Sequence, residues 1–306
     1  MEVQLQQLVY FVAVAETRHF TQAAERVRVA QPSLSKQIRN LEAELGAPLF
    51  SRARGNITLT PAGEILLPLA RRILADVDTA RLQVQELVGL RRGRVRLGAT
   101  PSLCAGLLAD VLRRFHDTYP GIQLLVEESG SRDLTRALTR GAVDLALIIL
   151  PPQGGDPALT TTPILRERLV VASSANSPPP VTGRALRVAD LRDHPLVMFR
   201  PGYDLREATL NACRHAGFEP RFAVEGGEMD AVLRFVEAGL GVAVVPSMVL
   251  VGRPGLRSTP LEPVLERTVA LAHRKDVTLT HAVRAFRNTL LTHLTSAALP
   301  SGVELH

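Results

Sequence analysis

One face of a predicted helix carries side chains that are suited to contacting DNA. Apolar residues recur along this helix at spacings of four, three and four: Leu34, Ile38, Leu41 and Leu45. They form a single stripe that is expected to pack against the rest of a small domain. The opposite face presents side chains that can reach base edges or phosphates in a major groove: Gln31, Ser33, Ser35, Lys36 and Arg39. Pro32 suits the first turn, where its missing N–H leaves no helical hydrogen bond unmade.

The elements predicted before and after this helix indicate which kind of domain it belongs to. A shorter helix is predicted from Phe20, with Thr21 as its N-cap. After the polar helix, residues 49–52 and 57–59 predict two short strands, with Arg52 and Arg54 near the turn between them. Helix, turn, helix and basic wing in this order indicate a winged helix-turn-helix that binds DNA. A solvated helical hairpin is the alternative, and it leaves the basic wing unexplained.

A long helix is predicted next, over residues 60–90, with Thr60 as N-cap and Pro61 in the first turn. Its apolar residues follow a heptad spacing over three repeats: Leu66, Ala70, Ile73, Val77, Ala80, Val84 and Leu87. At 1.5 Å per residue this helix is about 45 Å long, more than a small domain can cover. We expect the same helix of a second copy to cover the seam, and burial within one chain is the alternative.

Strands and helices alternate after a short basic segment at residues 90–94, which favours α/β architecture with a mostly parallel sheet. Strands are predicted at 95–99, 122–128, 143–150, 165–172, 196–199, 221–225, 242–245 and 268–272. Helices are predicted at 102–119, 133–140, 205–216, 230–238 and 280–294. The order indicates two α/β lobes with chain crossings between them, and lobes of this kind bind small molecules where strands end.

Polar and aromatic side chains follow several of these strands and could line such a cleft. The candidates for effector binding are Thr100, Ser102, Ser129, Ser131, Phe199 and Arg200. Hydroxyl groups at helix starts can hold a carboxylate, Arg200 can pair with an acid, and Phe199 can stack on a ring. The alternatives are that the hydroxyls act only as helix caps and that Arg200 is a solvated loop residue.

Composition excludes several other classes of protein. The 306 residues carry a net charge of +6, which permits a nucleic acid partner without establishing one. No GxSxG, HExxH or P-loop motif occurs, and the histidines are scattered, so we expect neither an enzyme nor a cofactor. Cys104 and Cys213 lie far apart, which favours small buried residues over a redox pair. No signal pattern or long apolar run is present, and we expect a cytoplasmic protein with no membrane partner.

The N-terminal motifs resemble those of the LysR-type transcriptional regulators. The residues that carry the resemblance are LVYFVAVAE at 8–16, FTQAAERVRVAQPSLSKQIRNLEAELGAPLF at 20–50 and LTPAG at 59–63. Members of that family often carry a basic residue where Gly55 stands here. The resemblance implies a periplasmic-binding-protein-like effector domain, an effector that is a small organic acid, and a tetramer built as a dimer of dimers. It also covers the remainder of the chain, as a domain pattern more than as motifs.

These observations predict three parts. Residues 1–60 form the winged helix-turn-helix, 61–92 the dimerising linker helix and hinge, and 93–306 the effector-binding domain. Within that domain lobe I spans about 93–163 and 268–300, and lobe II spans about 164–267. The predicted function is regulation of transcription: double-stranded DNA is bound at a palindromic promoter site, and a small-molecule effector binds in the inter-lobe cleft. A ligand-independent or redox-responsive regulator is one alternative, and a carrier or enzyme on a solute-binding scaffold is another.

Overall fold

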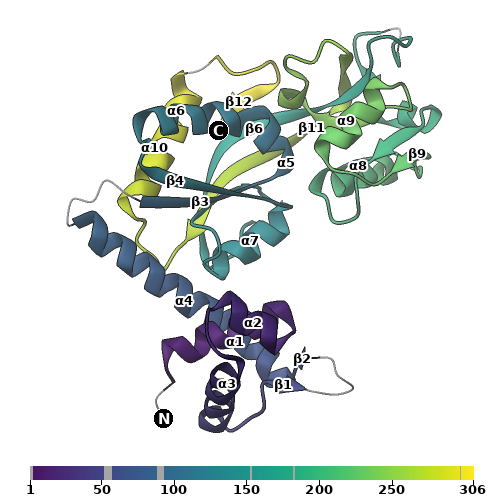
Figure 1. The fold of residues 1–306 in the computed structure, drawn as a ribbon. Helices are drawn as coiled ribbons and strands as arrows, with labels where there is room; N and C mark the ends of the chain where they lie inside the picture. The colour runs from purple at the N-terminus through teal and green to yellow at the C-terminus, as the bar shows by residue number, and fades with distance from the viewer. Residues whose placement is uncertain (1–2, 52–56, 88–92, 152–153, 182, 297) are drawn as a thin grey trace. The chain divides into compact units, whose positions relative to one another are not determined.

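A computed structural model describes residues 3–51, 57–87, 93–151, 154–181, 183–296 and 298–306 (Figure 1). The chain divides into two compact units. The first unit holds Met1–Leu90 with Thr139–Ala142, and the second unit holds Arg91–Leu138 with Val143–His306. No helix within the described ranges is long and apolar enough to cross a membrane.

The first unit contains helices and a small two-stranded antiparallel sheet. Its elements are α1 (Leu5–Thr17), α2 (Phe20–Arg26), α3 (Gln31–Leu45), β1 (Phe50–Ser51), β2 (Thr58–Leu59) and α4 (Pro61–Leu87). The predicted polar helix is therefore α3, and β1 and β2 are the two strands of the wing. The N-cap of α2 is His19 and not Thr21, because the His19 ring accepts a hydrogen bond from the Gln22 N–H.

The wing is held against the helices by an aromatic cluster and a carboxylate. Phe50 of β1 packs against Phe11 and Phe20, with ring centroids 5.3 and 5.9 Å apart. One oxygen of Glu42, on α3, accepts hydrogen bonds from the N–H groups of Leu49 and Phe50, at 2.9 and 3.3 Å. These contacts fix the end of α3 to the start of the wing.

Position 63, in the first turn of α4, has room only for glycine. A Cβ atom at this position would lie 2.3 Å from the Leu49 carbonyl oxygen, a backbone atom that cannot turn away. We expect Gly63→Ala to lower the free energy of unfolding of the first unit by about 1–3 kcal/mol or more. Urea unfolding followed by circular dichroism measures the change. Gly183→Ala is the control, because the nearest atom to its Cβ lies at 3.9 Å. Equal effects of the two variants would contradict this explanation.

The long helix α4 begins as predicted, with the Thr60 hydroxyl accepting a hydrogen bond from the Gly63 N–H. In the first turns of α4, part of the predicted apolar seam packs inside the first unit. Ala70 is fully buried and Leu66 is half-buried against the core of the first unit. Among the described side chains of α4, the large apolar ones that are exposed are Ile65, Leu69, Ile73 and Val84, at 69%, 51%, 43% and 61%. Ile73 and Val84 belong to the predicted seam, and Ile65 and Leu69 lie beside it.

The second unit begins with β3 (Gly93–Ala99), a helical segment and β4 (Ile122–Glu128). The helical segment consists of α5 (Pro101–Leu103), one turn of π-helix (Cys104–Leu108) and α6 (Ala109–Thr118). The next elements are α7 (Ser131–Thr139), β5 (Leu145–Ile149), β6 (Leu159–Ser174), β7 (Leu186–Arg187), a 3-10 turn (Val188–Asp193) and β8 (Leu196–Met198). They are followed by α8 (Asp204–His215), β9 (Phe222–Glu225), α9 (Met229–Glu237), β10 (Ala243–Pro246), a 3-10 turn (Ser247–Leu250), β11 (Leu256–Arg274), α10 (His281–Ser296) and β12 (Val303–Leu305).

Two long strands, β6 and β11, run through the second unit as an antiparallel pair whose register shifts between Pro260 and Leu265 (Figure 1). They contribute to a sheet of eight strands with the main order β10-β6-β11-β5-β3-β4. Only β3 with its neighbours β4 and β5, β7 with β11, and β8 with β9 pair in parallel among the described strands. The prediction of a mostly parallel sheet was therefore wrong, because the chain crosses between lobes twice and the crossing strands run in opposite directions.

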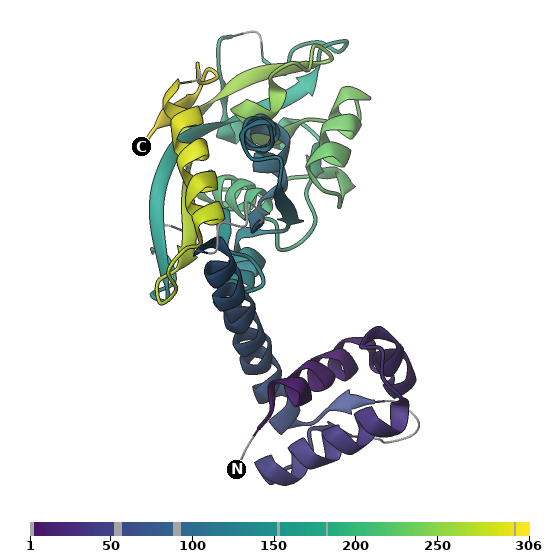
Figure 2. The ribbon, with the colours of Figure 1, turned by 60° about the vertical axis from the view of Figure 1, so that its left-hand side comes forward.

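The crossing strands connect two groups of elements. β11 pairs with β5 at Val269–Ala272, on the lobe I side, and β6 pairs with β10 at Leu169–Ala172, on the lobe II side. Helix α10 packs on α6 and β3, and Figure 2 shows it in yellow beside the long strands. The ends of β3 and β4 and the start of α8 consequently meet near the crossing strands.

Candidate functional site

The polar face of α3 is exposed, as the sequence indicates, but Leu45 at the end of the predicted apolar stripe is also exposed, at 39%. Gln31, Pro32, Ser33, Lys36 and Arg39 are all exposed, and Leu34, Ile38 and Leu41 are fully buried. Ser35 differs from the expected pattern, because it is only 8% exposed and its hydroxyl accepts a hydrogen bond of 2.9 Å from the Gln31 side chain. Ser35 thus orients Gln31. Arg52 and Arg54, predicted at the wing, lie outside the described residues.

A narrow pocket in the second unit lies where β3 ends and α8 begins. It is lined by Thr100, Pro101, Ser102, Gly130, Tyr203, Asp204, Leu205 and Arg267. Thr100 and Ser102 are 3% and 0% exposed, and their hydroxyl oxygens are 3.4 Å apart. The walls are so close that no water-sized space remains between them. A ligand can therefore enter only if the two lobes move apart.

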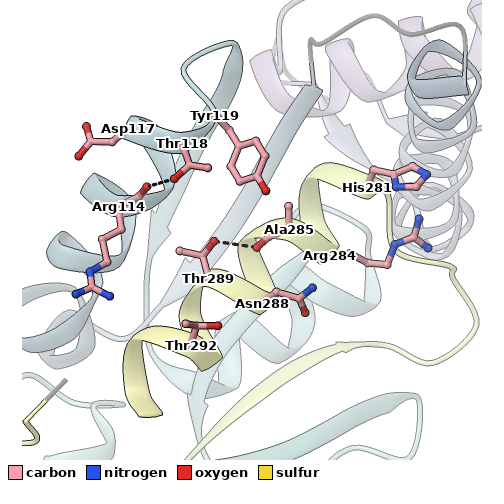
Figure 3. Close-up of a pocket in the computed structure, with 10 residues that line it drawn as sticks. All are labelled: Arg114, Asp117, Thr118, Tyr119, His281, Arg284, Ala285, Asn288, Thr289 and Thr292. Carbon is pink, nitrogen blue, oxygen red and sulfur yellow. Dashed lines mark hydrogen bonds between the residues drawn. The ribbon is translucent and has the colours of Figure 1, made fainter. Parts of the chain in front are cut away.

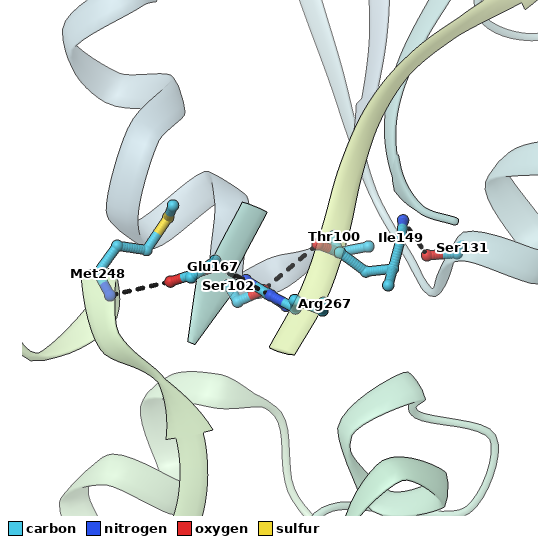
Figure 4. Close-up of polar contacts among 7 residues, drawn as sticks. All are labelled: Thr100, Ser102, Ser131, Ile149, Glu167, Met248 and Arg267. Atoms are coloured by element: carbon cyan, nitrogen blue, oxygen red, sulfur yellow. Dashed lines mark hydrogen bonds and ion pairs between the residues drawn. The ribbon is translucent and has the colours of Figure 1, made fainter. Parts of the chain in front are cut away.

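A buried ion pair forms the floor of this pocket. Arg267 of β11 donates to one oxygen of Glu167 on β6, at 2.7 and 2.9 Å, and the two residues are 8% and 0% exposed. A third guanidinium N–H donates to the Ser102 hydroxyl at 2.9 Å, and the other Glu167 oxygen accepts from the Met248 N–H at 2.9 Å (Figure 4). One network thus connects both crossing strands, the start of α5 and the turn after β10.

A second polar contact joins the two lobes. The Asp204 carboxylate, at the start of α8, accepts from the Ser131 hydroxyl at 2.6 Å and from the Ser131 N–H at 3.3 Å. The Ser131 hydroxyl in turn accepts from the Ile149 N–H at 2.9 Å. Ser131 begins α7, so a carboxylate of the protein itself occupies that helix start.

The remaining predicted residues lie beside the pocket and do not line it. Phe199 is buried and stacks on Tyr203, with ring centroids 4.6 Å apart and an interplanar angle of 10°. Arg200 donates to Glu228, on its own lobe. The N–H of Ser129 donates to the Ala99 carbonyl at 3.2 Å. The structure therefore brings together Thr100 and Ser102, places Ser131 next to them, and holds Phe199 behind Tyr203.

Four polar lining or floor residues were not predicted from the sequence: Glu167, Tyr203, Asp204 and Arg267. Tyr203 is 3% exposed, and its hydroxyl has no hydrogen-bond partner among the described residues. No local signal in the sequence indicates the ion pair. Glu167 lies between two arginines and Arg267 follows a glutamate, so the buried partners do not stand out from their charged neighbours.

A second hollow lies between α6 and α10 and is an open groove of about 730 Å³. Its walls include Arg114, Tyr119 and His281 (Figure 3). The Thr118 and Thr289 hydroxyls donate to carbonyls of their own helices, those of Arg114 and Ala285. Two hydroxyls of the groove are thus engaged within their own helices, and none of the predicted site residues lies there.

The cysteines are in environments that suppress thiolate formation. Burial, followed by the neighbouring Glu128 carboxylate, raises the pKa of the Cys104 thiol to about 12. Burial and Glu219 raise the pKa of the Cys213 thiol to about 11. Both thiols are free in the structure.

We expect both thiols to react at least about tenfold more slowly than free cysteine with a disulfide reagent at pH 8, because the thiolate is the nucleophile. Absorbance of the released aromatic thiol measures the rate, and the chain unfolded in guanidinium is the control. A rate equal to that of free cysteine would restore the redox-responsive alternative.

Comparison with known proteins identifies the family to which the chain belongs. Residues 5–64 match the family described as "Bacterial regulatory helix-turn-helix protein, lysR family", and residues 89–295 match "LysR substrate binding domain". The chain is a LysR-type transcriptional regulator. This confirms the predicted family and fold class. It also confirms that the regulator is not an enzyme and that it binds DNA through its helix-turn-helix.

Relatives of the regulator extend over nearly its whole length. It is 33% identical over 287 residues to the transcriptional dual regulator GltC of Bacillus subtilis (strain 168), covering 93% of this chain and 95% of the relative. A full-length OxyR variant from Pseudomonas aeruginosa superimposes with a TM-score of 0.73 at 27% identity, covering 99% and 98% of the two chains. Full-length CbnR complexed with its target DNA superimposes with a TM-score of 0.69 at 26% identity, covering 94% of this chain and 99% of CbnR.

Proposed function

We propose that the regulator reads an interrupted palindrome through the exposed first half of α3. Gln31 and Ser33 are the candidates for base contacts, and Lys36 and Arg39 are the candidates for phosphate contacts. The hydrogen bond from Gln31 to Ser35 supports this assignment, because it holds an amide at a fixed position on the exposed face. Arg52 and Arg54 remain predicted contacts of the wing.

A second copy of the chain is proposed to pack on α4. The exposed apolar stripe of Ile65, Leu69 and Ile73 supports this pairing, because large apolar side chains in a row are seldom left in water. Ile73 belongs to the predicted seam, whereas Leu66 and Ala70 face the core of their own unit. Two copies place two recognition helices on two half-sites, and the proposed assembly is a dimer or a dimer of dimers.

The proposed effector is a small organic acid that binds in the pocket between the lobes. The observation that carries this proposal is the grouping of the Thr100, Ser102 and Tyr203 hydroxyls with the Arg267 guanidinium in one buried pocket. Hydroxyls and a guanidinium are donors that hold a carboxylate. Since the pocket walls leave no water-sized space between them, an effector that binds there favours a different lobe arrangement and shifts the population between two DNA-bound assemblies.

Footprinting and mobility shift on the DNA upstream of the regulator's own gene test this proposal. The measurement uses a stated salt concentration and a panel of aromatic and dicarboxylic acids, because salt alone changes DNA affinity strongly. A long protected region that shortens or moves with one acid is the expected result. Protection unchanged by every acid would contradict the effector assignment, and absence of binding at low salt would contradict the DNA assignment.

A further inference from the structure

Two buried polar atoms on the lobe II side of the pocket lack a partner. They are the Tyr203 hydroxyl and the Oε2 oxygen of Glu228, and no described residue forms a hydrogen bond with either. The Tyr203 side chain is 97% buried and lines the pocket next to Asp204 and Arg267. A buried hydroxyl without a partner is costly, so its position indicates a group that arrives from outside the protein.

The charge of Arg267 is already balanced. Three of its N–H groups are taken by Glu167 and Ser102, and Glu167 is fully buried beside it. The Arg200 guanidinium is likewise paired with Glu228. An arriving carboxylate therefore finds hydrogen-bond donors in this pocket but no unbalanced positive charge.

One further carboxylate at the pocket has no cation. In the part of the chain that the structure describes, Asp204 lines the pocket, forms no ion pair and is held by Ser131. Burial raises the pKa of the Tyr203 hydroxyl, the Glu228, Glu128 and Asp204 carboxylates raise it further, and Arg267 lowers it. Asp204 therefore leaves one uncompensated negative charge at the pocket.

We propose that the effector is a zwitterion of the amino acid class. Its carboxylate lies against the hydroxyls of Ser102 and Tyr203 and the Arg267 guanidinium, and its ammonium group lies against Asp204. This inference rests on the proposed effector function and deepens it, because a plain acid would bring a second uncompensated negative charge into the pocket.

Asp204 is the specificity-determining residue in this account. Both hydrogen bonds from Ser131 go to the same oxygen of Asp204, Oδ2. Its other oxygen, Oδ1, is left to accept a hydrogen bond from an ammonium group. Because Ser131 belongs to lobe I and Asp204 to lobe II, an ammonium group bound to Asp204 also lies at the boundary between the two lobes.

A matched-ligand titration on the full-length chain tests the proposal. The twenty protein amino acids are screened by thermal shift, and each one that stabilises the chain is compared by calorimetry with the same carbon skeleton lacking the amino group. Examples are L-glutamate with glutarate and L-phenylalanine with 3-phenylpropanoate. We expect at least one amino acid to bind about tenfold or more tightly than its deaminated partner.

A variant of the unpaired carboxylate sharpens this test. Asp204→Asn keeps an oxygen for Ser131 but removes the charge, and it should weaken binding of the amino acid by about tenfold and leave the deaminated acid within about twofold. Asp110→Asn, on the exposed side of α6, is the matched control and should change neither ligand.

The outcomes separate this inference from the proposed function. Deaminated acids that bind as tightly as the amino acids, or an Asp204→Asn variant that binds the amino acid unchanged, would overturn the zwitterion assignment and leave an acid-responsive regulator. Absence of binding by either ligand series, together with an unchanged footprint, would overturn both.

Discussion

Replacing Arg267 by methionine is expected to lower the free energy of unfolding of the second unit by about 3–5 kcal/mol. The variant leaves the Glu167 carboxylate fully buried without its counter-charge, and among the described residues only the Met248 N–H still donates to it. Urea unfolding followed by circular dichroism measures the loss. Because β11 and β6 pair directly at these two residues, the effect should appear in the whole unit and not in one loop.

Two comparison variants show whether the unpaired buried charge causes the loss of stability. Arg136→Met removes an exposed ion pair with Asp133 and should change the free energy of unfolding by no more than about 0.5 kcal/mol. Combining Arg267→Met with Glu167→Leu should recover much of the loss, because no unpaired charge is left in the core. An Arg267→Met variant as stable as Arg136→Met would contradict the role given to this network.

Alanine at Gln31, Lys36 and Arg39 together is expected to weaken binding to the upstream DNA by about 100-fold or more. The change removes a side chain proposed to contact base edges and two proposed to neutralise phosphates, so the dependence of affinity on salt should also become shallower by about one unit per lost phosphate contact. Fluorescence anisotropy at several salt concentrations measures both effects.

A matched triple variant in the second unit controls for charge and residue type. Arg113, Gln123 and Lys275 are exposed there, and their replacement by alanine removes the same side-chain types or charges. DNA affinity and salt slope should stay close to those of the unaltered chain. If both triple variants weaken DNA binding equally, α3 is not the recognition helix.

The first unit could be predicted closely from sequence because its signals are local. The apolar spacing of Leu34, Ile38 and Leu41 defines the buried side of α3, and all three are fully buried. Thr60 and Pro61 mark the start of α4 in the same way. The burial of Ser35 was not predicted, because the spacing of apolar residues does not show that the Gln31 side chain donates a hydrogen bond to the Ser35 hydroxyl.

The pocket was predicted only in part because its residues are distant in the sequence. Thr100 and Ser102 were identified by their place after a strand, and they line the pocket. Glu167 and Arg267 meet because β6 and β11 pair in a register that no local pattern reveals. Asp204 directly precedes the helix predicted at 205–216 and was not among the predicted site residues, because its contact with Ser131 depends on the packing of two lobes.

The most direct test of the account is a measurement of reciprocal coupling between effector and DNA. Calorimetry gives the affinity of the best-binding small molecule for the free regulator and for the regulator saturated with its upstream DNA. If the cleft controls DNA binding, the two affinities differ by the same factor by which the small molecule changes DNA affinity. Identical affinities with and without DNA, alongside a footprint that the small molecule still alters, would show that the cleft is not the controlling site.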